Sequence, residues 1–182
     1  MEYDFGDTAW RHVVIGTLRS WNFGDPRGFR SRGHRIHSSG DYKNPPPKVE
    51  HEKLREYHVK RHAAPRVEIP QHMRKKIGAA FVRKLVALKY RVIAASVGAK
   101  HAHFLVELPD DYRKERAVIG KAKNISSYVV RNELPGRIWG AGGRFRLIKD
   151  RKHHENVFFY ISKRQERGAW TWTFRDTLPP EE

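Results

Sequence analysis

The sequence predicts an α+β fold, in which helices pack on a central antiparallel sheet. The predicted elements follow the order strand, helix, strand, strand, helix, strand, helix, and no internal repeat interrupts them. The chain has 182 residues, of which 38% are apolar, enough for one domain with a modest core. We therefore expect residues 1–182 to form a single domain.

The first third of the chain predicts one strand and one long basic loop. Residues 12–18 are rich in β-branched side chains, which is typical of a strand. Residues 20–48 are rich in Gly, Pro, Arg, Ser and His, so we expect a long loop with little regular structure there. A weakly patterned short helix is expected at about 50–61.

The middle of the chain predicts a helix followed by a hairpin. Pro70 opens a helix at 70–88, in which four apolar residues recur at helical spacing: Ile77, Phe81, Leu85 and Leu88. Residues 91–98 predict a buried strand, and residues 100–108 predict a second one. Gly98 and Ala99 lie where the two strands meet, so we expect the strands to pair as a hairpin.

The last third predicts two helices and another strand. A helix is expected at 113–133, ended by the Pro135-Gly136 pair. A strand is expected at 144–149 and a last helix at 152–167. Residues 168–182 are expected to form an extended or loose tail. The complete order of elements is related to ferredoxin-like arrangements.

The charge of the chain predicts a polyanionic partner. Its 37 Lys and Arg residues against 20 Asp and Glu residues give a formal net charge of +17. Aromatic side chains are interleaved with the basic ones, as in proteins that combine phosphate contacts with base stacking. Nucleic acid is therefore the favoured partner, although charge alone does not distinguish DNA from RNA.

Composition also excludes several classes of protein. No run of about 18 apolar residues is present, so we expect no transmembrane helix and no membrane partner. The N-terminus is acidic and lacks an apolar signal core, so we expect a cytoplasmic, nucleoid-associated protein rather than a secreted one. The chain has no cysteine, which excludes disulfides and requires that any metal be held by nitrogen and oxygen ligands.

Two histidines on the strand at 100–108 are the most informative feature. His101 and His103 are two residues apart, so on a strand their side chains project from the same face. Two imidazoles at this spacing can share one divalent ion. The alternative is a pair of strand-edge histidines bonded to the backbone.

Three motifs in this order resemble those of the HUH nucleases, and in particular the single-tyrosine transposases of insertion sequences and their REP-associated relatives. The motifs are Gly98-Ala-Lys-His101-Ala-His103-Phe-Leu-Val106, Ile138-Trp-Gly-Ala-Gly-Gly143 and Val157-Phe-Phe-Tyr160-Ile161. The resemblance covers residues 90–165 well and extends more loosely to the first strand and to the Gly24-Asp-Pro-Arg-Gly28 loop. It implies an HUH nuclease core built on the ferredoxin-like sheet.

The resemblance implies an enzyme that cleaves single-stranded DNA by transesterification. Tyr160 would attack a backbone phosphate, which yields a 5′-phosphotyrosine and a free 3′-OH. Mg²⁺ or Mn²⁺ held by His101 and His103 would polarise the phosphate. Tyr128 and Tyr112 are the rival tyrosines. The resemblance also implies hairpin DNA as substrate and a homodimer.

The third metal ligand stays open at this point. In the family a polar side chain on the tyrosine helix often completes the site, which suggests Gln165, five residues after Tyr160. Five residues turn a helix by about 500°, so Gln165 would lie about 140° from Tyr160. Water or a side chain earlier on the helix is the alternative, with three candidates: Asn156, His153 and His154.

Six basic residues are expected to contact the DNA backbone. They are Arg27, Arg30, Lys121, Lys123, Arg144 and Arg146.

Two other functions remain compatible with the sequence. One is a catalytically inactive or domesticated nucleic-acid-binding protein with the same fold. The other is an RNA-binding basic domain in which the two histidines have no catalytic role.

Overall fold

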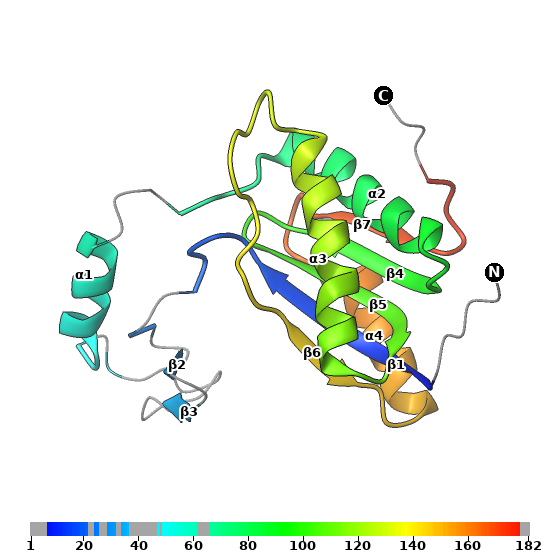
Figure 1. Cartoon of the computed structure of the whole chain (residues 1–182), viewed down its shortest axis with the longest axis horizontal. Coiled ribbons are helices and arrows are strands. Elements are labelled where there is room, and N and C mark those ends of the chain that lie inside the picture. The colour runs from blue at the N-terminus through cyan, green and yellow to red at the C-terminus, as the bar shows by residue number, and fades with distance from the viewer. Residues whose placement is uncertain are drawn as a thin grey trace. The chain divides into compact units, whose positions relative to one another are not determined.

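The computed structural model describes residues 7–21, 24–25, 29–31, 34–36, 47, 49–61 and 66–178, with the backbone alone for 29–31 and 34–36. The chain divides into two compact units (Figure 1). The larger unit comprises Met1–Thr17 and Glu68–Glu182, and the smaller one comprises Leu18–Val67. None of the described helices is long and apolar enough to cross a membrane.

The larger unit is built on a five-stranded antiparallel sheet. Its strands are β1 (Thr8–Gly16), β4 (Val92–Val97), β5 (His101–Pro109), β6 (Arg144–Leu147) and β7 (Trp170–Thr173), in the order β6-β1-β5-β4-β7. Its helices are α2 (Gln71–Ala87), α3 (Tyr112–Tyr128) and α4 (Arg151–Lys163). The first four strands of this order have the arrangement of a ferredoxin-like unit, so the predicted α+β class is confirmed.

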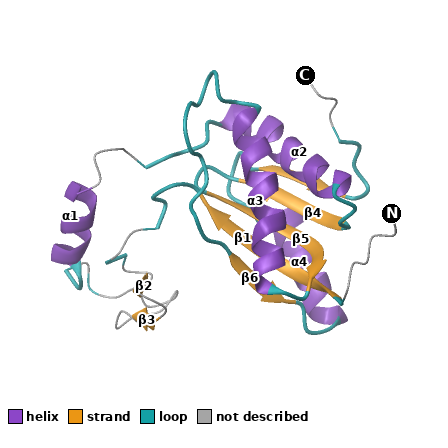
Figure 2. Ribbon diagram, viewed as in Figure 1, coloured by secondary structure: helices purple, strands orange, loops and turns teal. Residues whose placement is uncertain are grey.

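Helices cover both faces of this sheet. Figure 2 shows α2 and α3 in front of the strands and α4 behind them. Consecutive residues of β5 pack against helices on opposite faces of the sheet. Phe104 stacks on Phe81 of α2, with ring centroids 4.1 Å apart, whereas Leu105 packs with Val157 and Ile161 of α4. Because side chains alternate along a strand, each strand contributes to two separate apolar layers.

Local sequence signals set the starts of two helices. The Asp111 side chain accepts a hydrogen bond from the Lys114 backbone N–H and begins α3, and Asp150 does the same for His153 in α4. An N-terminal carboxylate satisfies an orphan N–H and interacts favourably with the helix dipole, a contribution of about 1 kcal/mol. These caps fix where the tyrosine-bearing helix α4 begins.

The segment expected as an extended or loose tail contributes a strand. Residues Trp170–Thr173 form β7, which pairs antiparallel with β4 at one edge of the sheet. The Trp-Thr-Trp-Thr alternation of aromatic and β-branched residues is a strand pattern. The larger unit therefore carries one more strand than the sequence prediction assigned to it.

The smaller unit contains a two-stranded ladder and a helix. Strands β2 (Phe29–Ser31) and β3 (His34–Ile36) pair antiparallel within the segment expected as an irregular basic loop. Helix α1 (Glu52–Arg61) corresponds to the short helix expected at 50–61, and none of its ten residues, all described, is buried. Gly24 has a φ of +79°, and an added Cβ would lie 2.7 Å from the Arg55 nitrogen, so the chain passes closely over the start of α1.

Candidate functional site

The two histidines of β5 lie on the sheet face covered by α4. In the β1–β5 register His101 pairs with Gly16 and His103 with Val14, and Leu105, two residues further on, packs under α4. His103 is 6% exposed, and the centroids of the two imidazole rings are 4.9 Å apart at 86°. The structure thus places both rings on one face, as expected from the spacing.

A third histidine, which the sequence analysis did not identify, lies beside this pair. His12 of β1 is 8% exposed, and its Nε2 is 3.1 Å from Nδ1 of His103. These two residues are 91 positions apart, so no local pattern could reveal their contact. The register between β1 and β5 brings them together, because Val14 and His103 are directly paired.

The other ring nitrogen of His103 has no partner among the described residues. Its Nε2 is buried without a hydrogen bond, and so is Oγ of Ser96, which pairs with His103 across β4 and β5. Buried polar atoms are nearly always satisfied in folded proteins. An unsatisfied imidazole nitrogen therefore indicates a position where a ligand can bind.

Burial keeps both inner imidazoles neutral. Desolvation, followed by the charges of Arg146, His153 and Arg144, lowers the pKa of His12 to about 4. Desolvation, with His101 and His12 as smaller causes, lowers the pKa of His103 to about 3. A neutral imidazole can coordinate a metal ion, whereas a group with so low a pKa is a weak general base at neutral pH.

Tyr160 is the tyrosine that the structure brings to these histidines. Its ring centroid is 5.3 Å from that of His103 and 6.1 Å from that of His12, and the residue is 40% exposed. Val157 and Ile161, on either side of it in sequence, are buried against the sheet and anchor α4. Tyr160 is therefore held over the histidines while it remains accessible from solvent.

The rival tyrosines lie on helix α3, which covers the opposite face of the sheet. Tyr112 is 60% exposed and packs its ring edge-on against Phe145. Tyr128 is 59% exposed and lies under the Arg131 guanidinium, 3.7 Å from the ring centroid. Within the part of the chain that the structure describes, neither ring packs on His12, His101 or His103.

Gln165 closes the end of α4. Its Nε2 donates a 2.8 Å hydrogen bond to the Tyr160 carbonyl, which also accepts from the Arg164 backbone N–H. The other candidates are engaged elsewhere or exposed: the His154 ring packs on Trp10, His153 Nδ1 accepts from the Lys149 N–H, and Asn156 is exposed. Among the residues that the structure describes, no three His, Asp or Glu side chains are arranged to hold a metal.

Two of the predicted basic residues flank the histidines. Arg144 and Arg146 of β6 pair with Val14 and His12 of β1, so they share the sheet face of the cluster, and both are exposed. Their charges contribute to the lowered pKa of His12, which indicates that they act at close range. This edge of the site is therefore strongly positive.

The four other basic residues lie away from the cluster or outside the described side chains. Lys121 is exposed on α3. Lys123 donates hydrogen bonds to the carbonyls of Gly140 and Gly142, at 2.9 and 2.6 Å, and burial lowers its pKa to about 8. Arg27 lies outside the described residues, and Arg30 belongs to β2 with its side chain outside them.

The Trp-Gly motif at 138–143 forms a loop at the end of β1. Trp139 is buried and donates from Nε1 to Ser126 of α3, and the Gly140 N–H donates to the Gly16 carbonyl. Gly16 is the β1 partner of His101. The motif therefore braces the strand end beside the histidines, and Lys123 holds the loop from α3.

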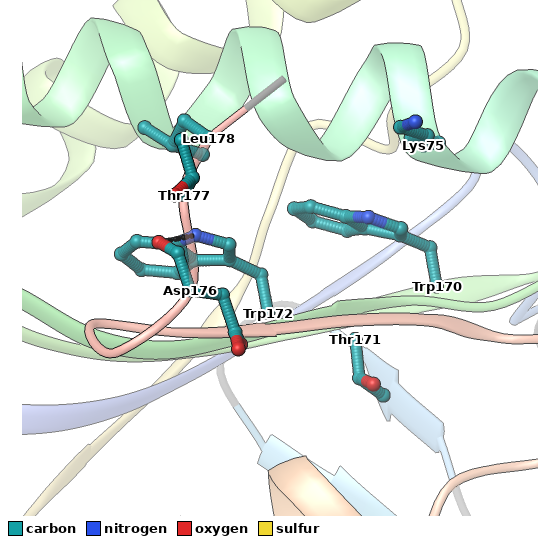
Figure 3. Close-up of a pocket in the computed structure, with 7 residues that line it drawn as sticks. All are labelled: Lys75, Trp170, Thr171, Trp172, Asp176, Thr177 and Leu178. Carbon is teal, nitrogen blue, oxygen red and sulfur yellow. Dashed lines mark hydrogen bonds between the residues drawn. The ribbon is translucent and has the colours of Figure 1, made fainter.

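A separate pocket lies between β7 and α2 (Figure 3). It has a volume of about 310 Å³ and is lined by Lys75, Trp170, Thr171, Trp172, Asp176, Thr177 and Leu178. Trp170 fills the space over Gly78 of α2, where an added Cβ would lie 2.1 Å from the indole. The pocket includes none of the predicted site residues.

Comparison with known proteins finds a distant structural likeness and no match in sequence. No protein-family model matches the chain, and no curated protein matches it. A solved structure of a REP-associated tyrosine transposase bound to a REP hairpin matches over 88% of this chain and 68% of that chain, with 13% identity and a TM-score of 0.41. A likeness at this level assigns no family, so the functional proposal depends on this chain's own residues.

Proposed function

We propose that the protein is a metal-dependent nuclease and strand transferase for single-stranded DNA, with Tyr160 as its nucleophile. One observation carries the proposal: an accessible tyrosine stands with its ring centroid 5.3 Å from that of a buried, neutral histidine that has an unsatisfied nitrogen. A structural tyrosine on α4 needs no such neighbour, because Val157 and Ile161 already anchor the helix.

The charge around this tyrosine suits a phosphodiester. Arg144 and Arg146 share the sheet face of the histidines, and the whole chain carries a net charge of +17. Exposed arginines beside a nucleophile can hold the backbone phosphate and stabilise the charge that develops on its oxygens. We take single strands beside DNA hairpins as the substrate class.

His101 and His103 are the residues that would hold a divalent cation. The unsatisfied Nε2 of His103 and the neutral state of its ring fit this role. A bound Mg²⁺ or Mn²⁺ supplies polarisation of the phosphate and neutralises developing charge. Histidine with water and oxygen ligands is compatible with either ion.

The chemistry at Tyr160 is a transesterification. A bond forms between the Tyr160 oxygen and phosphorus, and the bond from phosphorus to the 3′-oxygen breaks. The phenol loses its proton to water, and the leaving 3′-oxygen gains one, so the products are a 5′-phosphotyrosine and a free 3′-OH. One phosphoester replaces another, which makes the step reversible by an incoming 3′-OH without a nucleotide cofactor.

A DNA-binding protein without catalysis is the second candidate. The observation in its favour is the Gln165 amide, which is bonded to the Tyr160 carbonyl instead of facing the histidines. In that case the basic face would still bind single strands, but Tyr160 would form no covalent bond.

A covalent-adduct assay separates the two candidates. The full chain is incubated with labelled hairpin oligonucleotides that carry single-stranded flanks, with Mn²⁺ or with EDTA, and is resolved under denaturing conditions. We expect a Mn²⁺-dependent protein–DNA band that Tyr160→Phe abolishes and Tyr128→Phe retains. Retention of the band in Tyr160→Phe would exclude this nucleophile. Absence of a band across several hairpins that the protein binds would favour the non-catalytic candidate.

A further inference from the structure

We infer that His12 is a positioning residue, which accepts a hydrogen bond from Nδ1–H of His103 and so leaves the His103 Nε2 lone pair available to a divalent cation. The tautomer is a property of the protein without metal. The cation itself rests on the proposed function.

The contact between the two rings requires a choice of tautomer. His12 Nε2 and His103 Nδ1 are 3.1 Å apart, a hydrogen-bond distance, so one of these two nitrogens carries a proton and the other accepts it. A neutral imidazole carries one proton, so one ring donates and the other accepts. If His12 donates, the proton of His103 is on Nε2; if His103 donates, Nε2 has a free lone pair.

The environment of His103 Nε2 favours the second arrangement. This atom is buried with no hydrogen-bond partner among the described residues. A buried N–H without an acceptor is rarer in proteins than an acceptor without a donor. The proton of His103 is therefore better placed on Nδ1, where His12 accepts it.

A cation shared between His12 and His103 explains the site less completely. Such an ion would lie between His12 Nε2 and His103 Nδ1 and would leave His103 Nε2 still buried without a partner. The hydrogen bond accounts for one nitrogen of His103, and a ligand on the other side accounts for the second.

The sheet, rather than a loop, maintains this geometry. His12 and His103 lie on neighbouring strands that are joined in continuous register from Thr8–Pro109 to Gly16–His101. The two residues are 8% and 6% exposed, so water competes little for their hydrogen bond. A buried second ring that fixes the tautomer of a ligand typically changes metal affinity about 10- to 100-fold.

The tautomer can be tested without DNA or catalysis. Two-bond ¹H–¹⁵N correlations of the metal-free full chain report which nitrogen of His103 carries its proton. We expect the Nδ1–H form in the wild type and loss of that preference in His12→Phe. An Nε2–H form in the wild type would overturn the inference.

Cation binding provides the second measurement, with Mn²⁺ alone as the titrant in calorimetry. We expect His12→Phe to bind Mn²⁺ about 10- to 100-fold more weakly than the wild type, and His12→Gln, whose amide oxygen can accept, to recover most of the affinity. His72→Phe, at a 69% exposed side chain of α2 on the opposite face of the sheet, is the control and is expected to bind as the wild type does. Equal Mn²⁺ affinity in His12→Phe and the wild type, or no Mn²⁺ binding by the wild type, would overturn the inference that His12 prepares His103 to bind a cation.

A diamagnetic titration with Mg²⁺ distinguishes positioning from direct ligation. We expect the ¹⁵N shift of His103 Nε2 to move on binding and that of His12 Nε2 to change little. A large shift of His12 Nε2 would make His12 a ligand and overturn the inference. An adduct assay that fails while these results hold would overturn the proposed nuclease and leave the role of His12 intact.

Discussion

The two faces of the larger unit's sheet differ in how their buried polar groups are compensated: one face holds a charge with counter-charges, and the other holds two neutral rings. On the face under α3, the buried Arg11 guanidinium pairs through Nε with Glu115 and through Nη2 with Asp110, and its Nη1 has no partner among the described residues. On the face under α4, His12 and His103 share one contact, and a nitrogen of His103 has no partner in the described part of the chain. Arg11 and His12 are consecutive residues, so strand alternation alone separates the two environments.

The difference distinguishes a buried polar group that stabilises the fold from one that remains available to bind a ligand. A buried charge with bonded counter-charges stabilises one arrangement of the chain and offers little to a ligand. A buried neutral ring with an unsatisfied atom contributes less to stability and keeps a binding position available. Substitutions on the Arg11 face should therefore lower the free energy of unfolding. Substitutions around the histidines should change ligand binding or the pH dependence of stability.

The largest effect on stability is expected from Glu115→Ala. Glu115 is 3% exposed and bonds the Arg11 guanidinium, so its removal leaves a buried cation with only one counter-charge. Breaking a buried pair from one side costs about 3 kcal/mol or more. Urea unfolding followed by circular dichroism measures this loss.

Asp110→Asn is the matched comparison for Glu115→Ala. The Asp110 side chain is 56% exposed, so solvent screens its pairing with Arg11 and the expected loss is about 1 kcal/mol or less. Equal losses from the two substitutions would contradict the view that the buried carboxylate compensates Arg11.

The histidine face should make stability depend on pH. The folded pKa values of His12 and His103, about 4 and about 3, lie below the unfolded value of about 6.5, so on acidification the unfolded chain binds protons first. The free energy of unfolding then falls as the pH drops through 6.5, by about 1.5 kcal/mol per histidine between pH 6.5 and 5. Unfolding midpoints in urea at pH 7, 6 and 5 measure the slope.

Removing the buried histidines should flatten this slope. We expect the double variant His12→Gln/His103→Gln to lose less stability between pH 7 and 5 than the wild type does. His72→Gln, at a side chain that is 69% exposed, should leave the slope unchanged. A double variant with the wild-type slope would show that these two rings are not the acid-sensitive groups.

Local patterns were sufficient for most elements of the larger unit, β7 excepted, and for three of the four residues of the cluster, His101, His103 and Tyr160. The two-residue spacing of His101 and His103 predicts a shared face, and the helix expected at 152–167 together with the motif at 157–161 points to Tyr160. His12 could not be found this way, because its contact depends on a strand register across 91 residues. The functions of His101, His103 and Tyr160 stay predictions until they are measured.

Two side chains of the site region show why residue type alone does not assign a role. Lys123 resembles a phosphate ligand in sequence, but its ammonium bonds two carbonyls of the Trp-Gly loop. Gln165 resembles a metal ligand, but its amide bonds the last turn of α4. In both cases a nearby backbone carbonyl accepts a hydrogen bond from the side-chain nitrogen, and the fold of the chain determines which carbonyls are near.

A smaller loss of stability is expected from Lys123→Met. The substitution keeps the length of the side chain but removes the donor that the Gly140 and Gly142 carbonyls share, so we expect a loss of about 1 kcal/mol. Hydrogen exchange of the Gly140 N–H, which donates to Gly16, should also become faster. Lys121→Met, at an exposed position of the same helix, is the control, and equal losses from both variants would contradict a specific clamp.

The smallest effect on folding, but a measurable one on binding, is expected from Arg144→Gln and Arg146→Gln. Both side chains are exposed on the edge strand β6 and share the face of His12, so their removal should leave the unfolding midpoint nearly unchanged. Each phosphate contact on a single strand contributes about 0.7 to the slope of log affinity against log salt concentration, so each variant should lower the slope by about that amount. Lys121→Gln removes the same charge from α3, over the opposite face of the sheet. A lower slope for the two arginine variants and an unchanged slope for Lys121→Gln would indicate that the single-stranded DNA lies along the histidine face. If the net charge of the protein alone attracted the DNA, all three substitutions would lower the slope alike.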